Sequence, residues 1–237
     1  MCNRYRPASV VRIRDAFGFT YIESGPDMRV NDRGIGPLQP GPFVRRDEAL
    51  VGQWGLIPDG SKTRKPTRAN GRPMSTNNAR FGRGQPEAFT FRGPWWRGQR
   101  CLVPVEDFDE PCYAVTRKNI WWRMRRADGE ILALAGLWNA WTDPGTGEIV
   151  ESYTMLTINC NAHPLLSLMH KPDIDEDGKE LPADQQDKRT VVPIERQHWD
   201  EWLHGSNEQA AALVRLPAHD LFVHGPADPA VSATLPL

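Results

Sequence analysis

Cys2 stands directly after Met1, and this position gives it chemistry that an internal cysteine lacks. A small second residue favours removal of Met1, which leaves a free α-amine and a thiol on one residue. Such a 1,2-aminothiol can trap an aldehyde, because the amine forms a Schiff base and the thiolate then closes a five-membered thiazolidine ring. Both groups have ordinary pKa values near ~8, so a usable fraction of each is reactive at neutral pH. The position therefore predicts a covalent nucleophile.

The composition limits the classes of partner. The chain has 237 residues, of which 39% are hydrophobic and 25% charged. This length suits one large hydrophobic core or two small ones, and we favour a single domain. Because the net charge is −1, a polyanion must be bound by a local patch and not by the protein as a whole. The sequence has no apolar run of about 18 residues for a membrane helix and no apolar core of a signal peptide.

The remaining thiols give no sign of a metal or redox motif. The cysteines are Cys2, Cys101, Cys112 and Cys160, and no two of them form a C-x-x-C pair. This spacing disfavours a zinc ribbon or a redox motif. Reduced thiols of this kind fit a cytoplasmic protein.

The elements that must position Cys2 are predicted to be short strands. The 21 prolines and 20 glycines divide the chain into brief apolar stretches. The predicted strands are Ala49–Leu56, Cys101–Val105, Ala114–Val115 continued after a turn by Ile120–Met124, Ile131–Leu137 and Tyr153–Ile158. Asp128-Gly129 predicts a hairpin that joins Trp121–Arg125 to Ile131–Leu137.

Helices are predicted to be fewer. They are a short helix containing Asp15–Phe19, a helix over Asn161–Met169, an amphipathic helix over Glu195–Leu203 and another over Asn207–Leu216. Two stretches are predicted to be loops. One is Pro58–Pro73, rich in Lys, Arg and Gly, which we call the basic loop. The other is Asp173–Asp187, which we call the acidic segment and which is too polar to fold alone.

Five short motifs and a helix follow Cys2 along the chain. They are Trp54-Gly55-Leu56-Ile57-Pro58, Asn78-Ala79-Arg80, Arg100-Cys101-Leu102-Val103-Pro104 leading to Glu110, Thr157-Ile158-Asn159-Cys160-Asn161, Met169-His170-Lys171-Pro172 and the Trp199–Leu203 helix. In this order they resemble the SRAP family, the SOS-response-associated peptidases or abasic-site-processing proteins. Each motif is weak alone, but five in the family's order are hard to obtain by chance. The similarity runs from residue 2 to about residue 203.

The resemblance implies a set of catalytic residues. Cys2 matches the family's nucleophile, and Asn78 matches the asparagine of its N-A-R triplet, which positions the N-terminal amine. Glu110, and not Glu106, falls on the carboxylate of the family's F-Y-E-W segment. His170 matches the histidine of the family's I-H-x-R-M-P motif.

The chemistry of these side chains suits the implied roles. A buried carboxylate with a raised pKa can move protons while the carbinolamine collapses, and we expect this of Glu110. A histidine has an ordinary pKa near neutrality, so we expect His170 to titrate there and to help open the closed deoxyribose ring. His163, seven residues earlier on the same predicted helix, is the competing candidate.

A second set of residues is implied to contact DNA. Arg4 and Arg80 match arginines that hold phosphates, a task that suits the planar guanidinium group. Pro40 sits where the family has a turn whose proline wedges against a base, and Thr157 falls on the threonine of the T-x-x-A-N motif. Lys171, directly after His170, is a candidate for the arginine of I-H-x-R-M-P, and Arg189 is the other candidate.

The sequence departs from the family pattern in several places. Asn3 replaces the usual glycine after the nucleophile, and Asp109-Glu110-Pro111 replaces Y-E-W. The family has a tryptophan in the loop before N-A-R, whereas residues 58–77 contain none. Trp95 or Trp96 could supply base stacking instead, although a role in packing is the more common one for such residues.

Two other classes of function remain open on the sequence. Class II glutamine amidotransferases also use a processed N-terminal cysteine, with its own α-amine as the base. They need a glycine at position 3 and further glutamine-binding motifs, and this chain has Asn3 and lacks those segments. A pure single-strand-binding module would need no terminal thiol, so its binding would survive the loss of Cys2.

The sequence and the resemblance together predict a single α+β domain over residues 1–237, in which 204–237 form a C-terminal extension. We expect a mostly antiparallel sheet or partly open β-barrel with flanking helices. The implied function is the covalent capture of abasic sites in single-stranded DNA, in an SOS-type response, without a metal or organic cofactor. The family's peptidase activity would concern exposure of Cys2, and its Schiff-base chemistry is lyase-like. We expect a cytoplasmic monomer, at the nucleoid when it acts, with no membrane partner.

Overall fold

Strands dominate the fold. The computed structural model describes residues 2–18 and 34–237. Its strands are β1 (Tyr5–Pro7), β2 (Pro40–Arg45), β3 (Glu48–Trp54), β4 (Asn78–Gly82), β5 (Gln85–Pro86), β6 (Arg100–Cys112), β7 (Ile120–Arg126), β8 (Leu132–Thr142), β9 (Ile149–Asn159), β10 (Arg189–Val191) and β11 (Phe222–Pro226). Its α-helices are α1 (Val10–Phe17), α2 (Phe89–Trp96), α3 (Trp199–His204) and α4 (Asn207–Leu213).

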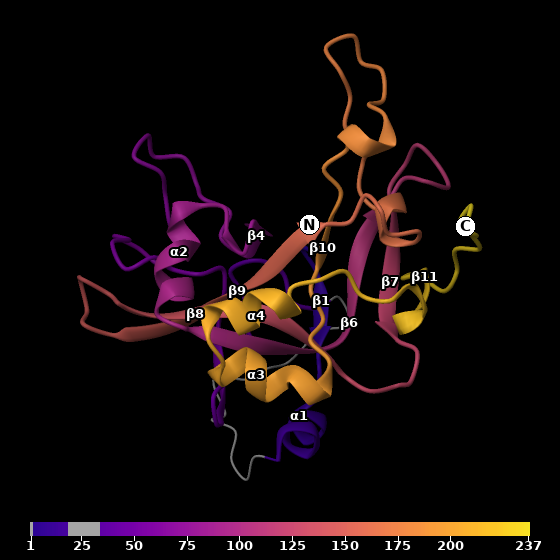
Figure 1. Cartoon of the computed structure of the whole chain (residues 1–237). Helices are drawn as coiled ribbons and strands as arrows, with labels where there is room; N and C mark the ends of the chain where they lie inside the picture. The colour runs from indigo at the N-terminus through magenta and orange to yellow at the C-terminus, as the bar shows by residue number, and fades with distance from the viewer. Residues whose placement is uncertain (1, 19–33) are drawn as a thin grey trace.

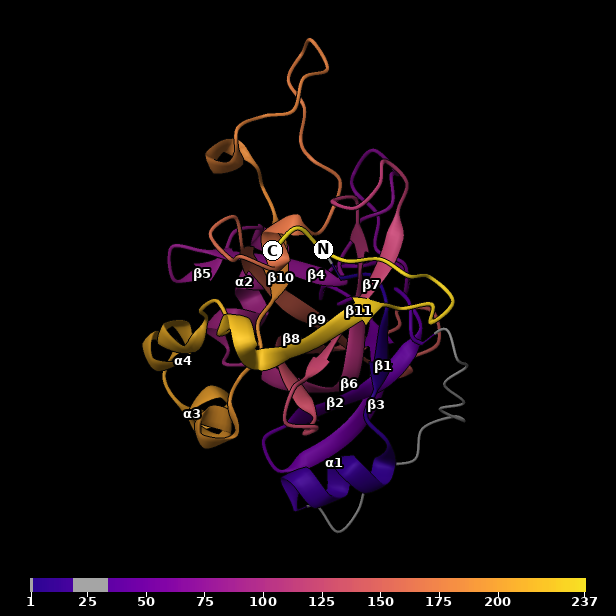
Figure 2. The ribbon, with the colours of Figure 1, turned by 90° about the vertical axis from the view of Figure 1, so that its right-hand side faces the viewer.

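Five strands close into a barrel at the centre of the molecule. β6 pairs with β8, β8 with β9, β9 with β3, β3 with β2, and β2 returns to β6 at Val44 and Leu102. Most of these pairs are antiparallel, while β3 and β4 run parallel to β9. The α+β fold with few helices and a barrel is confirmed. Figures 1 and 2 show α3 and α4 on one side of the sheet and α1 below it.

Alternating side chains of the barrel strands form two cores, because successive residues of a strand point to opposite faces. The inner core takes residues from all five barrel strands, among them Phe43, Leu50, Cys101, Leu134 and Tyr153. The outer core packs the opposite faces of the strands against the helices, and it includes Leu102, Ala135, Leu156, Trp95 and Trp202. The barrel is therefore filled by side chains and is no channel.

The predicted hairpin between β7 and β8 is wrong. Both strands run antiparallel to β6, with β7 on Phe108–Cys112 and β8 on Arg100–Val105. Since both have the same direction, they follow one another along a single edge of the long strand β6. Asp128-Gly129 does form a turn, with Gly129 at φ +77°, but the turn connects successive partners of β6 and does not reverse the chain.

The helix predictions were correct near the C-terminus and wrong in the middle. The predicted helix over Glu195–Leu203 is a 3₁₀ turn at Arg196–His198 followed by α3, and α4 lies within the other prediction. Asn161–Met169 has only the 3₁₀ turn Leu166–Leu168. The prediction of a helix containing Asp15–Phe19 falls on α1, which ends at Phe17, and Phe19 lies outside the described residues.

Two further elements differ from the sequence predictions. Helix α2 was missed because it contains Gly93 and Pro94, which disfavour a helix interior. Ala114–Val115 lies in a turn region and not in a strand, so β7 begins at Ile120.

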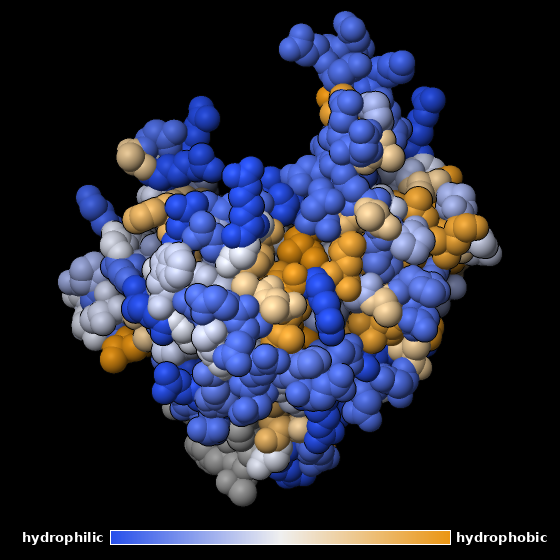
Figure 3. Space-filling view, viewed as in Figure 1, coloured by the Kyte–Doolittle hydropathy of each residue, from blue (hydrophilic) through white to orange (hydrophobic). Residues whose placement is uncertain are grey.

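The two predicted loops project from the barrel. The acidic segment contains a 3₁₀ turn at Ala183–Gln185 and an isolated β-bridge between Ile174 and Glu180. The side-chain amide of Gln186 bonds Asp173 and Leu181. Figure 1 draws this segment in orange above β10, and the basic loop lies on the α2 side. The face seen in Figure 3 is hollowed between these projections. No helix among the described residues is long and apolar enough to cross a membrane.

Gly136 provides a test of barrel packing. A Cβ at this position on β8 would lie 2.6 Å from the Thr154 carbonyl oxygen on β9 and 2.8 Å from the Cys101 Sγ on β6. We expect Gly136→Ala to lower the free energy of unfolding by ~1–3 kcal/mol, because the barrel must widen to admit a methyl group. The matched control is Gly225→Ala on β11, where nothing lies within 4 Å. Equal urea midpoints for the two variants would contradict this packing.

Candidate functional site

Cys2 is fully buried and held by hydrogen bonds, unlike an ordinary chain end. The side-chain amide of Asn78 donates to the Cys2 carbonyl oxygen at 2.6 Å, and that of Asn77 approaches the same oxygen at 3.4 Å. The Cys2 thiol donates to the Arg4 carbonyl oxygen over 3.5 Å. Burial, followed by the nearby charge of Glu110, raises the pKa of the Cys2 thiol well above its usual value.

Strand β1 carries Cys2 into the barrel. β1 pairs antiparallel with β6, with Tyr5 opposite Phe108, and the Asp109 backbone N–H donates to the Arg4 carbonyl oxygen at 3.0 Å. Tyr5 packs edge-on against Trp54 with ring centroids 5.0 Å apart, and its hydroxyl bonds that of Tyr153. These buried contacts fix the register of the N-terminal strand next to the end of β6 that bears Glu110.

Glu110 is a buried carboxyl on β6 with an exposure of 1%. Burial raises its pKa to about 7, and the negative charge of Asp109 acts in the same direction. A group with this pKa can both donate and accept a proton near neutral pH. The expectation of a buried carboxyl with a raised pKa is confirmed.

His170 lies against Glu110, with 3.3 Å between His170 Nε2 and Glu110 Oε2. Its backbone has φ +65°, a left-handed conformation that is costly for a residue with a Cβ. Three contacts hold it there. Its N–H donates to the Pro111 carbonyl at 2.6 Å, its carbonyl accepts from Lys188 Nζ at 2.9 Å, and its Nε2 lies 3.0 Å from the Arg189 carbonyl.

The expectation that His170 titrates near neutrality is wrong. Burial lowers its pKa to about 3, because the charged imidazolium would lose its hydration, and Lys188 adds a repelling charge. His170 is therefore neutral at pH 7, and its Nε2–H can donate to Glu110 and to the Arg189 carbonyl. Within this pair, Glu110 is the group that titrates near neutral pH.

The competing candidate His163 is placed differently. It lies in the turn before the 3₁₀ helix, where its Nδ1 accepts from the backbone N–H groups of Leu165 and Leu166 at 3.2 and 3.0 Å. This arrangement caps the turn. The two histidines do not share a helix face, since the predicted helix is absent.

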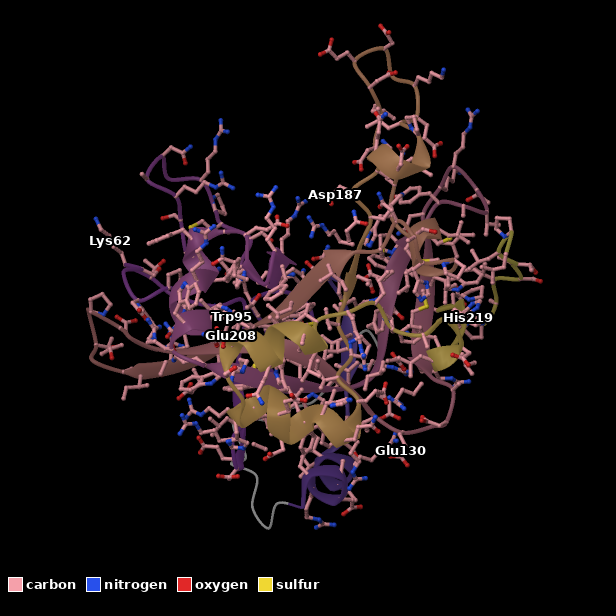
Figure 4. All side chains as sticks on the ribbon, in the orientation of Figure 1. Lys62, Trp95, Glu130, Asp187, Glu208 and His219 are labelled. Atoms are coloured by element: carbon pink, nitrogen blue, oxygen red, sulfur yellow. The ribbon has the colours of Figure 1, made fainter. Side chains whose placement is uncertain are left out.

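The two candidate phosphate-binding arginines each face a carboxylate. Arg4 bonds Asp109 through two nitrogens, at 2.8 and 2.7 Å, and its guanidinium lies 4.4 Å from the ring centroid of Trp121. Arg80 pairs with Asp187 of the acidic segment at 2.8 Å, and both side chains are close to half exposed. Figure 4 labels Asp187 at the base of that segment.

The other candidate DNA contacts differ in how far their side chains are exposed. Pro40 is exposed at the start of β2, opposite Gln53, and Lys171 is exposed directly after His170. Thr157 is fully buried in β9, between Arg80 on β4 and Val191 on β10, so its side chain does not reach the surface. Arg189 turns its side chain to Asp187 and Glu87.

Three residues of the site were missed by the sequence analysis. The Asn77 side chain donates to the Cys2 carbonyl oxygen at 3.4 Å and to the Asn3 side chain at 3.1 Å. A glycine at position 3 has no side chain to accept the second bond. Asp109 fixes Arg4, and Lys188 fixes the His170 backbone. The doubled asparagine before Ala79 was a usable signal for Asn77, while the other two contacts join distant parts of the chain.

The structure thus brings together four side chains that the sequence proposed. Asn78 contacts Cys2, Glu110 acts electrostatically on Cys2, and His170 contacts Glu110. Among the described residues, no group of three or more His, Cys, Asp or Glu side chains could hold a metal ion. The cluster offers a thiol, a titrating acid and a neutral imidazole, a set that suits covalent capture of an electrophile.

Comparison with known proteins identifies a relationship over almost the whole chain. The family model described as SOS response associated peptidase (SRAP) matches residues 1–233. A crystal structure of a protein from Bordetella bronchiseptica has 31% sequence identity and a TM-score of 0.74, covering 95% of this chain and 99% of that one. A protein from Bacteroides thetaiotaomicron shares the fold, with 18% identity, 97% of each chain covered and a TM-score of 0.71.

The buried carboxyl predicts how stability depends on pH. Between its ordinary value of 4.5 and its folded value of about 7, Glu110 binds more protons in the native than in the unfolded state. Wild-type stability at this site therefore falls as pH rises through that window. Glu110→Gln has no proton to lose, so its unfolding free energy relative to wild type should rise by up to about 3 kcal/mol between pH 4.5 and 8. Urea denaturation at both pH values measures this, and a constant difference would contradict it.

Proposed function

The chain belongs to the SOS response-associated peptidase family, and on this premise we propose that it captures abasic sites in single-stranded DNA covalently through Cys2. Family membership supports a role at abasic sites in damaged DNA. The observation that carries the finer proposal is the cluster in which Asn78 contacts Cys2, Glu110 acts electrostatically on Cys2, and His170 contacts Glu110. These are the groups that a thiazolidine-forming reaction needs.

The proposed reaction releases one water and needs no oxidant or reductant. After Met1 is removed, the α-amine of Cys2 adds to the C1′ aldehyde of the opened sugar. The carbinolamine then loses water and becomes a Schiff base. Finally, Sγ adds to the imine carbon while the imine nitrogen takes the thiol proton, which closes the thiazolidine ring.

Glu110 is assigned the proton transfers. With a pKa of about 7, its protonated form can donate to the departing hydroxyl of the carbinolamine, and its ionised form can then accept the thiol proton. This second transfer matters because the thiol has a raised pKa and ionises poorly unaided. We assign to neutral His170 the orientation of Glu110 and assistance in opening the sugar ring.

The hydrogen bond from Asn78 holds Cys2 at its carbonyl group and not at its nitrogen. Asn78 holds the carbonyl side, so the chain after Cys2 stays fixed when Met1 is removed. The reactive amine would form on the other side. We propose that the peptidase activity of the family name concerns this exposure of Cys2. Lyase-like activity would come from elimination in the Schiff base, in which a base takes the C2′ proton and the 3′ phosphate leaves.

DNA binding is assigned to the exposed side chains around the cluster. Arg4 and Arg80 would bind the phosphates that flank the lesion, with Pro40 and Lys171 as further contacts. Thr157 is buried and lies opposite Arg80 in the sheet, so it would support Arg80 and not contact DNA itself. We propose that the protein acts as a cytoplasmic monomer at the nucleoid and needs no metal or organic cofactor.

Cys2→Ser tests the covalent mechanism. The amine of the variant should still form a Schiff base that borohydride can trap, but no heat-stable thiazolidine. The measurement is a denaturing gel of the protein with an oligonucleotide that contains one abasic site. Cys160→Ser is the matched control, because a serine hydroxyl can keep the bond of the Cys160 thiol to the Leu166 carbonyl. Heat-stable cross-links formed by Cys2→Ser at the wild-type level would exclude the mechanism.

Asp187→Asn tests the phosphate role of Arg80. Asp187 occupies the guanidinium that would bind phosphate, so its neutralisation should tighten binding of single-stranded DNA by about two- to fivefold at low salt. Glu176→Gln removes the same charge from the exposed part of the acidic segment and is the control. Fluorescence anisotropy gives both dissociation constants. Equal gains in the two variants would indicate a general charge effect and count against a specific Arg80 site.

A further inference from the structure

Helix α2 exposes two aromatic side chains that the proposed reaction does not use. Phe89 begins the helix and is 87% exposed, and Trp96 ends it and is 60% exposed. They are the only aromatic residues among the large exposed hydrophobic side chains of the described residues. Trp95 between them is buried against Phe81 and Trp202, so helix α2 is firmly attached to the barrel through Trp95.

Phe89 lines a cavity between α2 and the basic loop. This cavity has a volume of about 440 Å³. Its apolar lining comes from Pro66 and Met74 on the loop side and from Phe89 and Pro94 on the helix. A planar ring of the size of a nucleobase fits such a space, and an exposed phenyl ring offers a face on which it can stack.

The loop that forms the other wall is strongly basic. The basic loop contains Lys62, Arg64, Lys65, Arg68 and Arg72 and one carboxylate, Asp59. Arg64 pairs with Glu148 at 2.6 Å, whereas the other four make no ion pair with any described residue. Figure 4 shows Lys62 on the same side of the molecule as α2. The loop therefore places four cations without a described ion-pair partner beside a cavity. The lining of this cavity contains one aromatic side chain, Phe89, and one carboxylate, Asp59, which pairs with Arg97 at 3.2 Å.

The basic loop leads along the chain into the candidate site. It is followed by Asn77 and Asn78, which hold the Cys2 carbonyl, and then by Arg80. On the opposite side of the hollow seen in Figure 3 stands the acidic segment, with seven carboxylates and one lysine. A polyanion that passes Cys2 is repelled from that side and attracted to the basic loop.

We propose that Phe89 and the basic loop bind the nucleotides that flank the lesion in single-stranded DNA. One base inserts into the cavity and stacks on Phe89, while Lys62, Lys65 and Arg68 bind the phosphates on the rim. Stacking accepts any base, so the contact adds affinity without sequence preference. The inference rests on the proposed function for the position of the lesion, but the surface should bind undamaged single strands as well.

The test is the affinity of Phe89→Ala for undamaged single-stranded oligonucleotides of increasing length, measured by fluorescence anisotropy. The dissociation constant should rise roughly fivefold or more for strands long enough to reach the cavity, and Phe89→Trp should restore binding. Val223→Ala is the matched control, since Val223 is an exposed apolar residue on β11 and is not part of this surface. Lys65→Gln should flatten the dependence of log Kd on log salt concentration by about one unit.

A second measurement separates this inference from the proposed function. It is the cross-linking of an abasic oligonucleotide by the wild type and by Val223→Ala, which should react at the same rate. If no oligonucleotide is cross-linked but Phe89→Ala still weakens binding, the proposed function fails and this inference stands. If cross-linking occurs and Phe89→Ala binds long and short strands as tightly as the wild type, the inference is overturned.

Discussion

The hydrogen bond from Asn78 to the Cys2 carbonyl is the contact on which the site depends. A residue next to the chain terminus normally frays, because few contacts offset the entropy lost on ordering it. Here Asn77 and Asn78 bind the backbone of Cys2, and the pairing of β1 with β6 fixes the residues that follow. Cys2 thereby acquires the rigidity of the barrel. These bonds hold its carbonyl group, whereas the proposed removal of Met1 takes place at its nitrogen.

Burial sets the protonation states around Cys2. The barrel removes water from a carboxyl, an imidazole and a thiol, and in each case the charged form is disfavoured. Glu110 then titrates near pH 7, while His170 stays neutral far below that pH. Proton transfer is consequently assigned to the carboxyl, and the histidine serves as a donor with a fixed orientation, held in a strained backbone conformation by its neighbours.

Opposite charges lie on the two projections beside the site. Asp187 contacts Arg80, so in the proposed complex the acidic segment competes with phosphate for this arginine. In the basic loop, Arg64 pairs with Glu148, and the other four cations make no ion pair with a described residue. DNA that binds this surface would replace the Asp187 carboxylate at Arg80 with a phosphate group. Charge of this kind acts over about 8–10 Å at physiological salt, so both projections can influence a strand bound between them.

The sequence by itself singled out Cys2 as the proposed nucleophile, because the chemistry of a cysteine after Met1 depends on chain position. It also predicted the strands β3, β6, β7, β8 and β9 and the helices α3 and α4, since their apolar periodicity is local, but it missed the other strands of the described residues. The tertiary structure decided the rest. Asp128-Gly129 specifies a turn, but only the length of β6 decides that β7 and β8 follow one edge. The low pKa of His170 and the pairing of Arg80 with Asp187 arise from burial and from contacts between distant segments, and local sequence encodes neither.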